Sequence, residues 1–126
     1  MAHRSRIATL CIDCRTDDLT EATAFWSAAL GKTPKPHEDG KYVTLGDDDD
    51  YPILLLQAVD HDPRVHLDIE TDDREAEVAR LKALGATEVA RIKTWIVMEA
   101  PTGHRFCIVR PQGGPGFPDR AQEWAE

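Results

Sequence analysis

The chain has 126 residues, which is the length of one compact domain with its own hydrophobic core. Hydrophobic residues make up 41% of it, too many for a disordered chain. A net charge of −8 argues against a nucleic-acid partner and against binding to an anionic membrane surface.

The cellular location of the protein is predicted from two features that the sequence lacks, a signal peptide and a disulfide framework. Asp13 and Arg15 interrupt the apolar segment near the start, so we do not expect it to act as the core of a signal peptide. Three cysteines are too few, and oddly numbered, for a disulfide framework. These features predict a cytoplasmic protein.

A first strand is predicted from Arg6 to Asp13, because apolar residues alternate there with polar ones. A helix follows, with Asp18 and Glu21 as a capping pair and Gly31 as its stop. We expect Phe25 and Trp26 to pack this helix against a sheet.

The next segment contains two prolines and is predicted to be an edge strand or a loop. A short strand over Lys41–Gly46 and a strong strand over Ile53–Val59 follow. The four aspartates between them lack the spaced ligands of a calcium loop, so we expect a solvated hairpin turn.

A second copy of this pattern begins near residue 63. The strand Arg64–Glu70 precedes a helix with Asp72 and Glu75 as its capping pair and with Val78, Leu81 and Leu84 on its apolar side. The last three strands are predicted at Thr87–Arg91, Trp95–Met98 and Arg105–Val109, with a turn at 100–103 before the last one.

The two copies share a strand, a Thr-Asp-Asp segment and a helix ending in Leu-Gly, so the chain contains an internal repeat. We predict an α+β fold of two tandem βαβββ modules that form a curved mixed sheet with a concave cup. One domain spans 1–126, with module one at about 6–60, module two at about 63–111 and a C-terminal tail at 112–126.

Strand parity assigns polar side chains to the cup. The repeat superposes Cys11 on His66 and Asp13 on Asp68, and the all-apolar faces of these strands are expected to meet the helices. Asp13 and Asp68 either act as a facing acid/base pair or pair locally with Arg15 or Arg64. Trp95 either offers a stacking surface in the cup or packs in the core.

The motifs together resemble the vicinal oxygen chelate superfamily, the glyoxalase and bleomycin resistance-like proteins. The resemblance rests on Phe25-Trp26 with Leu30-Gly31, on the segments 65–68 and 84–87, and on Ala100-Pro101-Thr102-Gly103 before the last strand. It covers about Arg6 to Pro111 and is greatest for a small glyoxalase-like branch with Leu-Leu-Gln in one strand and Phe-Cys in the last.

The resemblance implies four metal positions in the cup, usually occupied by His and Glu. They fall here on Cys11, Gln57, His66 and Cys107, and only His66 is of the usual type. The first expectation is therefore a metal-independent cup that holds a small organic ligand, with the acidic balance favouring a cationic one. The expected ligand-binding residues are Cys11, Asp13, Gln57, His66, Asp68, Trp95 and Cys107.

The alternative is a lyase, isomerase or dioxygenase that holds zinc or another soft divalent metal at Cys11, Gln57, His66 and Cys107. We also expect a homodimer, because the resemblance implies one and because Phe117 and Trp124 make the tail poorly suited to water.

Overall fold

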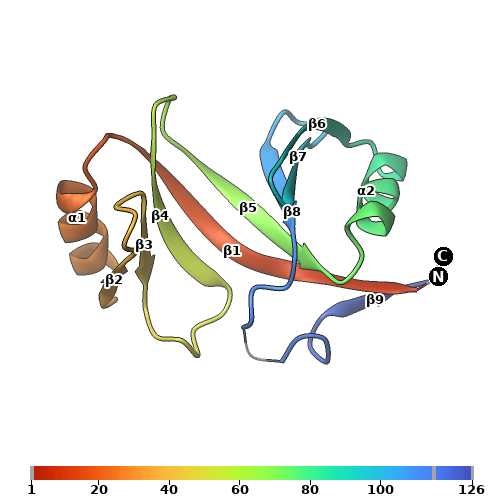
Figure 1. Cartoon of the computed structure of the whole chain (residues 1–126), viewed down its shortest axis with the longest axis horizontal. Coiled ribbons are helices and arrows are strands. Elements are labelled where there is room, and N and C mark those ends of the chain that lie inside the picture. The colour runs from red at the N-terminus through yellow and green to blue at the C-terminus, as the bar shows by residue number, and fades with distance from the viewer. Residues whose placement is uncertain (1, 115, 126) are drawn as a thin grey trace. The chain divides into compact units, whose positions relative to one another are not determined.

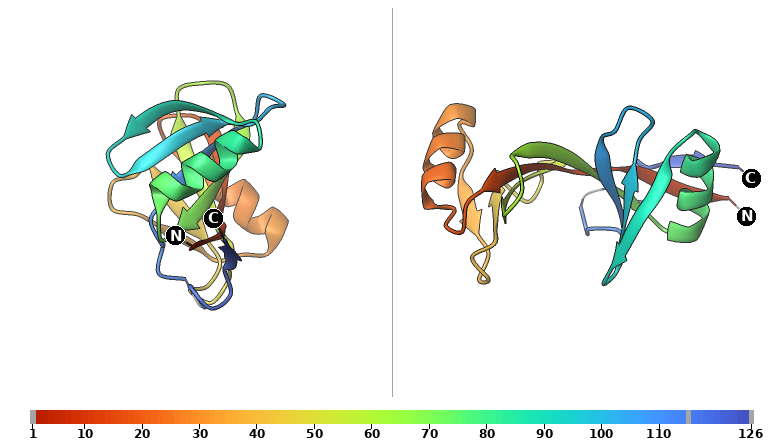
Figure 2. Two further views of the ribbon diagram at one scale, coloured as in Figure 1. Left: turned by 90° about the vertical axis from the view of Figure 1, so that its right-hand side faces the viewer. Right: turned by 90° about the horizontal axis from the view of Figure 1, so that it is seen from above.

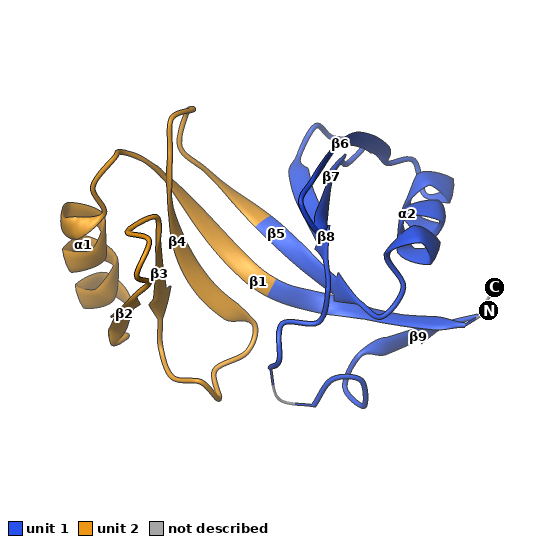
Figure 3. Cartoon of the chain, in the orientation of Figure 1, with its two compact units in different colours: residues 1–8, 67–126 blue, residues 9–66 orange. Residues whose placement is uncertain are grey.

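The structure is a computed structural model that describes residues 2–114 and 116–125. It divides into two compact units (Figure 3). Unit 1 comprises residues 1–8 and 67–126, and unit 2 comprises residues 9–66. Strands β1 (His3–Arg15) and β5 (Arg64–Thr71) each contribute residues to both units, and each unit is described by itself.

Unit 2 contains one strand–helix–three-strand arrangement (Figure 1). The end of β1 leads into α1 (Thr20–Leu30), and β2 (Pro34–Pro36), β3 (Tyr42–Leu45) and β4 (Ile53–Val59) follow. The strands lie in the order β2-β3-β4-β1. β4 runs parallel to β1, and β2 is at the edge, as its two prolines predict.

Unit 1 repeats this arrangement. β5 leads into α2 (Arg74–Ala83), and β6 (Thr87–Ile92), β7 (Trp95–Glu99) and β8 (Arg105–Val109) follow in the order β5-β8-β7-β6. β8 is parallel to β5. The prediction of two βαβββ modules in an α+β fold is therefore confirmed.

The register of the parallel strand pairs confirms the repeat residue by residue. Asp13 lies opposite Gln57 in the β1–β4 pair, and Asp68 lies opposite Cys107 in the β5–β8 pair. Asp13 and Asp68 therefore occupy equivalent positions, as do Gln57 and Cys107.

Each helix packs on one face of its own sheet (Figures 1 and 2). In unit 2, Trp26 of α1 packs against a core that contains Leu19, Val43, Leu45 and Leu56. In unit 1, the core residues are Val78, Ala86, Ile96, Met98 and Ile108. Burial of these side chains holds the helices in place.

Both predicted capping pairs are wrong in detail. The N-cap of α1 is Leu19, which makes no side-chain cap hydrogen bond, while Asp18 accepts from the backbone N–H and hydroxyl of Thr20. The N-cap of α2 is Asp73, which accepts from the N–H of Ala76. Asp72 instead accepts from the N–H of Arg4. The carboxylate that the local spacing assigned to capping the helix is therefore engaged in a long-range hydrogen bond.

Several apolar residues predicted to face a helix or a core are exposed. Phe25 is 61% exposed because neighbouring helix positions point in different directions, and Trp26 is the one that turns to the core. Leu84 is 67% exposed because it lies past the end of α2, at the C-cap. Val65, at 60%, and Leu10, at 36%, are also exposed, so the apolar faces of β1 and β5 are only partly covered in their units.

The C-terminal tail contacts unit 1 of its own chain. Strand β9 (Gln122–Trp124) pairs antiparallel with the first residues of β1, and the indole N–H of Trp124 donates to the Ser5 hydroxyl at 2.8 Å. The Trp124 ring also stacks on the Arg80 guanidinium, 3.8 Å from the ring centroid. Within the described residues, neither helix is of a length and apolarity that would cross a bilayer.

Candidate functional site

The candidate site in unit 2 begins on β1. Cys11 and Asp13 are two residues apart, so they share a face of the strand, and they are only 1% and 2% exposed. Ile12 and Cys14 lie on the opposite face and pack against the α1 core. Parity thus correctly separates polar residues from core residues at this end of β1.

Cys11 connects the first strand of the module to the last. Its thiol is 3.6 Å from Oδ1 of Asp13 and 3.6 Å from Oε1 of Gln57, so it donates towards both oxygens. The amide of Gln57 in turn donates to the Tyr42 hydroxyl at 3.2 Å. Tyr42 was not predicted from the sequence, and only the β3–β4 register, which sets it opposite Gln57, brings it to the site.

Asp13 is the centre of this hydrogen-bond network. The ring N–H at Nδ1 of His66 donates to Oδ2 of Asp13 at 2.8 Å, and Nε of Arg64 lies 3.6 Å from the same oxygen. A carboxylate as buried as this one is costly unless charged or polar donors surround it, and three donors do so here. Asp13 forms an ion pair with Arg64, one of the two arginines expected as partners, while Arg15 pairs with Asp62.

The Asp13 charge also affects a neighbouring thiol. Burial, and then the negative charge of Asp13, raise the pKa of Cys14 above its ordinary value. Cys14 is therefore a neutral, weakly reactive thiol on the core side of β1.

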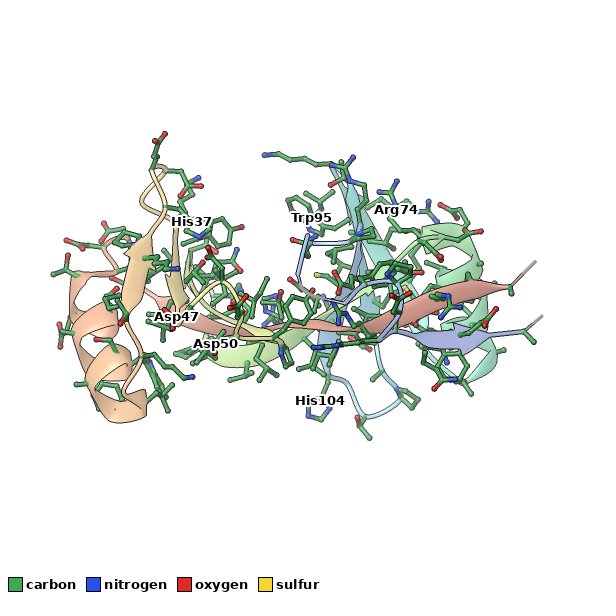
Figure 4. The ribbon with its side chains drawn as sticks, turned by 90° about the horizontal axis from the view of Figure 1, so that it is seen from below. His37, Asp47, Asp50, Arg74, Trp95 and His104 are labelled. Carbon is green, nitrogen blue, oxygen red and sulfur yellow. The ribbon has the colours of Figure 1, made fainter. Side chains whose placement is uncertain are left out.

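The remaining predicted site residues belong to unit 1. Asp68 and Cys107 are neighbours across the β5–β8 pair, and both are partly buried. Trp95 lies on β7, where it alternates with the core residue Ile96 and is partly buried (Figure 4). Alternation sends its ring to the face opposite the α2 core, which favours the surface role over the core role.

Unit 2 also contains an open depression of about 710 Å³ next to Gln57. Its walls come from the ends of β1 and β4, the loops after them, and Lys41 before β3. The lining residues are Arg15, Thr16, Asp17, Lys41, Gln57, Ala58, Val59, Asp60 and His61. Such a volume is within the range of small-molecule sites.

The cluster of Cys11, Asp13 and His66 is the arrangement to test for a metal, since one donor atom from each lies within 4.8 Å of the others. A thiol, one carboxylate and an imidazole do not fit a hard divalent ion, which prefers oxygen ligands. The carboxylate already accepts from His66 and Cys11 and is ion-paired with Arg64. Zinc would require loss of the thiol proton and of these hydrogen bonds.

Comparison with solved structures places the fold among known enzymes. The Mn(II)-bound glyoxalase from Novosphingobium aromaticivorans has a TM-score of 0.60 and 16% identity over 93% of this chain and 44% of that one. An extradiol ring-cleaving dioxygenase from B. fuscum has a TM-score of 0.56 and 19% identity over 83% and 32%. The chain thus spans less than half the length of either.

The methylmalonyl-CoA epimerase of Streptomyces coelicolor is similar to this chain in length as well. It has a TM-score of 0.56 and 18% identity, over 86% of this chain and 96% of the epimerase. At these identities the likeness concerns the fold alone. Among curated proteins, none matches this sequence closely enough to be called a relative.

The sequence itself matches a family, described as the glyoxalase-like domain, over residues 9–109. The match includes β1 from Thr9, both helices and every strand up to the end of β8. Because it covers most of the chain, this match shows that the chain belongs to the glyoxalase-like domain family.

Proposed function

We propose that this protein binds a small organic ligand without a metal, at the polar face that carries Cys11, Asp13, Gln57 and His66. The observation that carries the proposal is the state of Asp13, whose carboxylate is neutralised by Arg64 and hydrogen-bonded by His66 and Cys11. A site whose acidic group is already compensated by protein donors has no need of a cation for its stability.

The same face offers the mixture of groups that small-ligand sites use. Gln57 belongs both to the hydrogen-bond network and to the wall of the depression, so a ligand seated there reaches the network directly. Asp68, Trp95 and Cys107 remain predicted contributors from unit 1. We do not transfer the activity of the glyoxalase, dioxygenase or epimerase, because one fold supports many chemistries.

A metal-dependent lyase, isomerase or dioxygenase is the second candidate. The observation that favours it is the approach of Cys11, Asp13 and His66 to within 4.8 Å. In this proposal a soft ion such as zinc replaces the thiol proton, with Gln57 as a further ligand.

Metal analysis separates the two candidates. Untagged protein is purified from cells grown with added zinc, dialysed, and analysed by elemental mass spectrometry beside the variants H66A, C11A and C14A. C14A is the matched control, because Cys14 lies on the same strand but packs towards the core. The metal-free proposal expects background metal in all four proteins. One equivalent of metal that is retained in C14A and lost in H66A and C11A would overturn it.

A homodimer and a cytoplasmic location remain proposals as well. The tail no longer supports the dimer, because Trp124 is engaged by Ser5 and Arg80 of its own chain. Exposed Val65 and Leu10 in unit 2 support it instead, since large apolar side chains favour burial in an interface. Light scattering that shows a monomer at high concentration would exclude the dimer. Three free cysteines are compatible with a reducing compartment.

A further inference from the structure

Arg64 contacts the hydrogen-bond network of unit 2 and is also exposed to solvent. It is the first residue of β5 and lies two positions before His66, so the two side chains leave the strand on the same face. Both reach Oδ2 of Asp13, which sets the guanidinium beside the imidazole. Its side chain is 48% exposed, so a ligand can reach it.

The guanidinium is held in place from two sides. Nε lies 3.6 Å from Asp13, and Nη2 donates to Nε2 of His61 at 3.3 Å. The other ring nitrogen of His61, Nδ1, is 2.8 Å from the carbonyl oxygen of Asp62, which requires the proton on Nδ1 and leaves Nε2 as an acceptor. Because these contacts already order the side chain, binding a ligand costs less conformational entropy.

Part of the guanidinium remains available for a ligand. Its five N–H donors include two on Nη1, and within residues 2–114 and 116–125 no hydrogen bond or ion pair involves that nitrogen. His61, which accepts from Arg64, also lines the depression. Gln57 supplies a neutral amide on the wall of the same depression.

We infer that Arg64 binds a carboxylate of the ligand, so that the ligand is a small organic acid; this rests on the proposed function. A planar fork of N–H donors matches a planar carboxylate, and such charge-assisted hydrogen bonds are stronger than neutral ones. The local arrangement thus points away from the cationic ligand that the overall charge of −8 suggests. Net charge describes the whole surface, whereas recognition depends on the groups that meet the ligand.

The experiment compares four probes that share a phenyl ring and differ in the charge of the attached group: benzoate, benzamide, benzylamine and phenyl phosphate. Binding to the metal-free full chain is measured by titration in two-dimensional NMR at neutral pH, for wild type, R64Q, R64K and R91Q. Arg91 is the matched control, because it is 47% exposed and is likewise held by carboxylates, Glu75 and Glu88, but in unit 1.

Benzoate is expected to bind at least about tenfold more tightly than benzamide or benzylamine, with shifts at Gln57 and His61. R64Q is expected to lose this preference for benzoate, R64K to keep part of it, and R91Q to keep all of it. If phenyl phosphate binds more tightly than benzoate, the inference of a carboxylate is wrong, and the group that Arg64 binds is a phosphate ester.

Two further results would overturn the inference. One is that benzylamine or benzamide binds to wild type with the same affinity as benzoate. This comparison does not depend on the folding of any variant. The other is unchanged benzoate selectivity in R64Q. Binding of all probes at this face without selectivity, in metal-free protein, would contradict the role of Arg64 and leave the proposed function intact. One equivalent of bound metal would contradict the proposed function instead.

Discussion

Nε2 of His3 lies 2.7 Å from Oε1 of Glu77, a carboxylate whose side chain has no exposed surface. The two residues are 74 positions apart and belong to β1 and α2. Arg80 binds both oxygens of the same carboxylate, at 2.9 and 2.8 Å. This buried cluster anchors the first residues of the chain to the helix of unit 1.

The substitution E77Q is expected to destabilise the protein by about 3 kcal/mol, because it leaves the partly buried Arg80 without its charge partner. Urea unfolding followed by circular dichroism measures the change. E75Q is the matched control, two positions earlier on the same helix, since Glu75 also pairs with an arginine, Arg91, but is 70% exposed. Its urea midpoint is expected to stay near that of wild type. Equal midpoints for E77Q and E75Q would contradict the importance of burial.

Glu77 also predicts how stability depends on pH. Burial alone would raise the pKa of Glu77, but hydrogen bonds from Arg80, His3 and Ser5 outweigh it and hold the pKa below its ordinary value of 4.5. Because the folded pKa is lower than the unfolded one, the stabilisation is present above about pH 4.5 and is lost as the pH falls through the folded pKa.

Urea midpoints measured from about pH 7 down to about pH 3 test this dependence. Wild type is expected to lose stability below about pH 4.5 more steeply than E77Q, so that the two converge in acid. Parallel pH curves for the two proteins would show that Glu77 contributes nothing to acid unfolding.

Trp124 is predicted to hold β9 on the edge of β1. W124A removes both the stacking on Arg80 and the hydrogen bond to Ser5, and it is expected to cost about 2 kcal/mol. Hydrogen exchange is expected to speed up at residues 3–5 and 122–124, which form this strand pair. W124F keeps the ring without the N–H donor and is expected to lose about half as much. Unchanged exchange at residues 3–5 in W124A would contradict this role.

Cys14 is predicted to alkylate slowly at neutral pH, because burial and the Asp13 charge raise the pKa of its thiol. The rate with iodoacetamide, read at Cys14 by fragment-ion mass spectrometry, is expected to rise with pH to a midpoint above that of an unhindered thiol. D13N removes the negative charge and is expected to lower that midpoint. A midpoint that does not move in D13N would leave burial as the single cause.

The sequence by itself determined those features that depend on neighbouring residues. Segments rich in apolar residues identified β4 and β8 at their observed bounds, and Gly31 ends α1 in the left-handed conformation that glycine favours. The repeat predicted both modules, and parity set Cys11 and Asp13 on one face of β1, because strand side chains alternate regardless of what the strand packs against.

Only the tertiary structure decided which polar groups meet. Tyr42 joins Gln57 through strand register, Arg64 and His66 share one oxygen of Asp13, and Asp72 bonds Arg4 instead of capping α2. It likewise buried the carboxylate of Glu77, which the sequence analysis did not single out. Hydrogen bonds between residues far apart in the chain depend on how whole elements pair. The local spacing of residues does not specify that pairing.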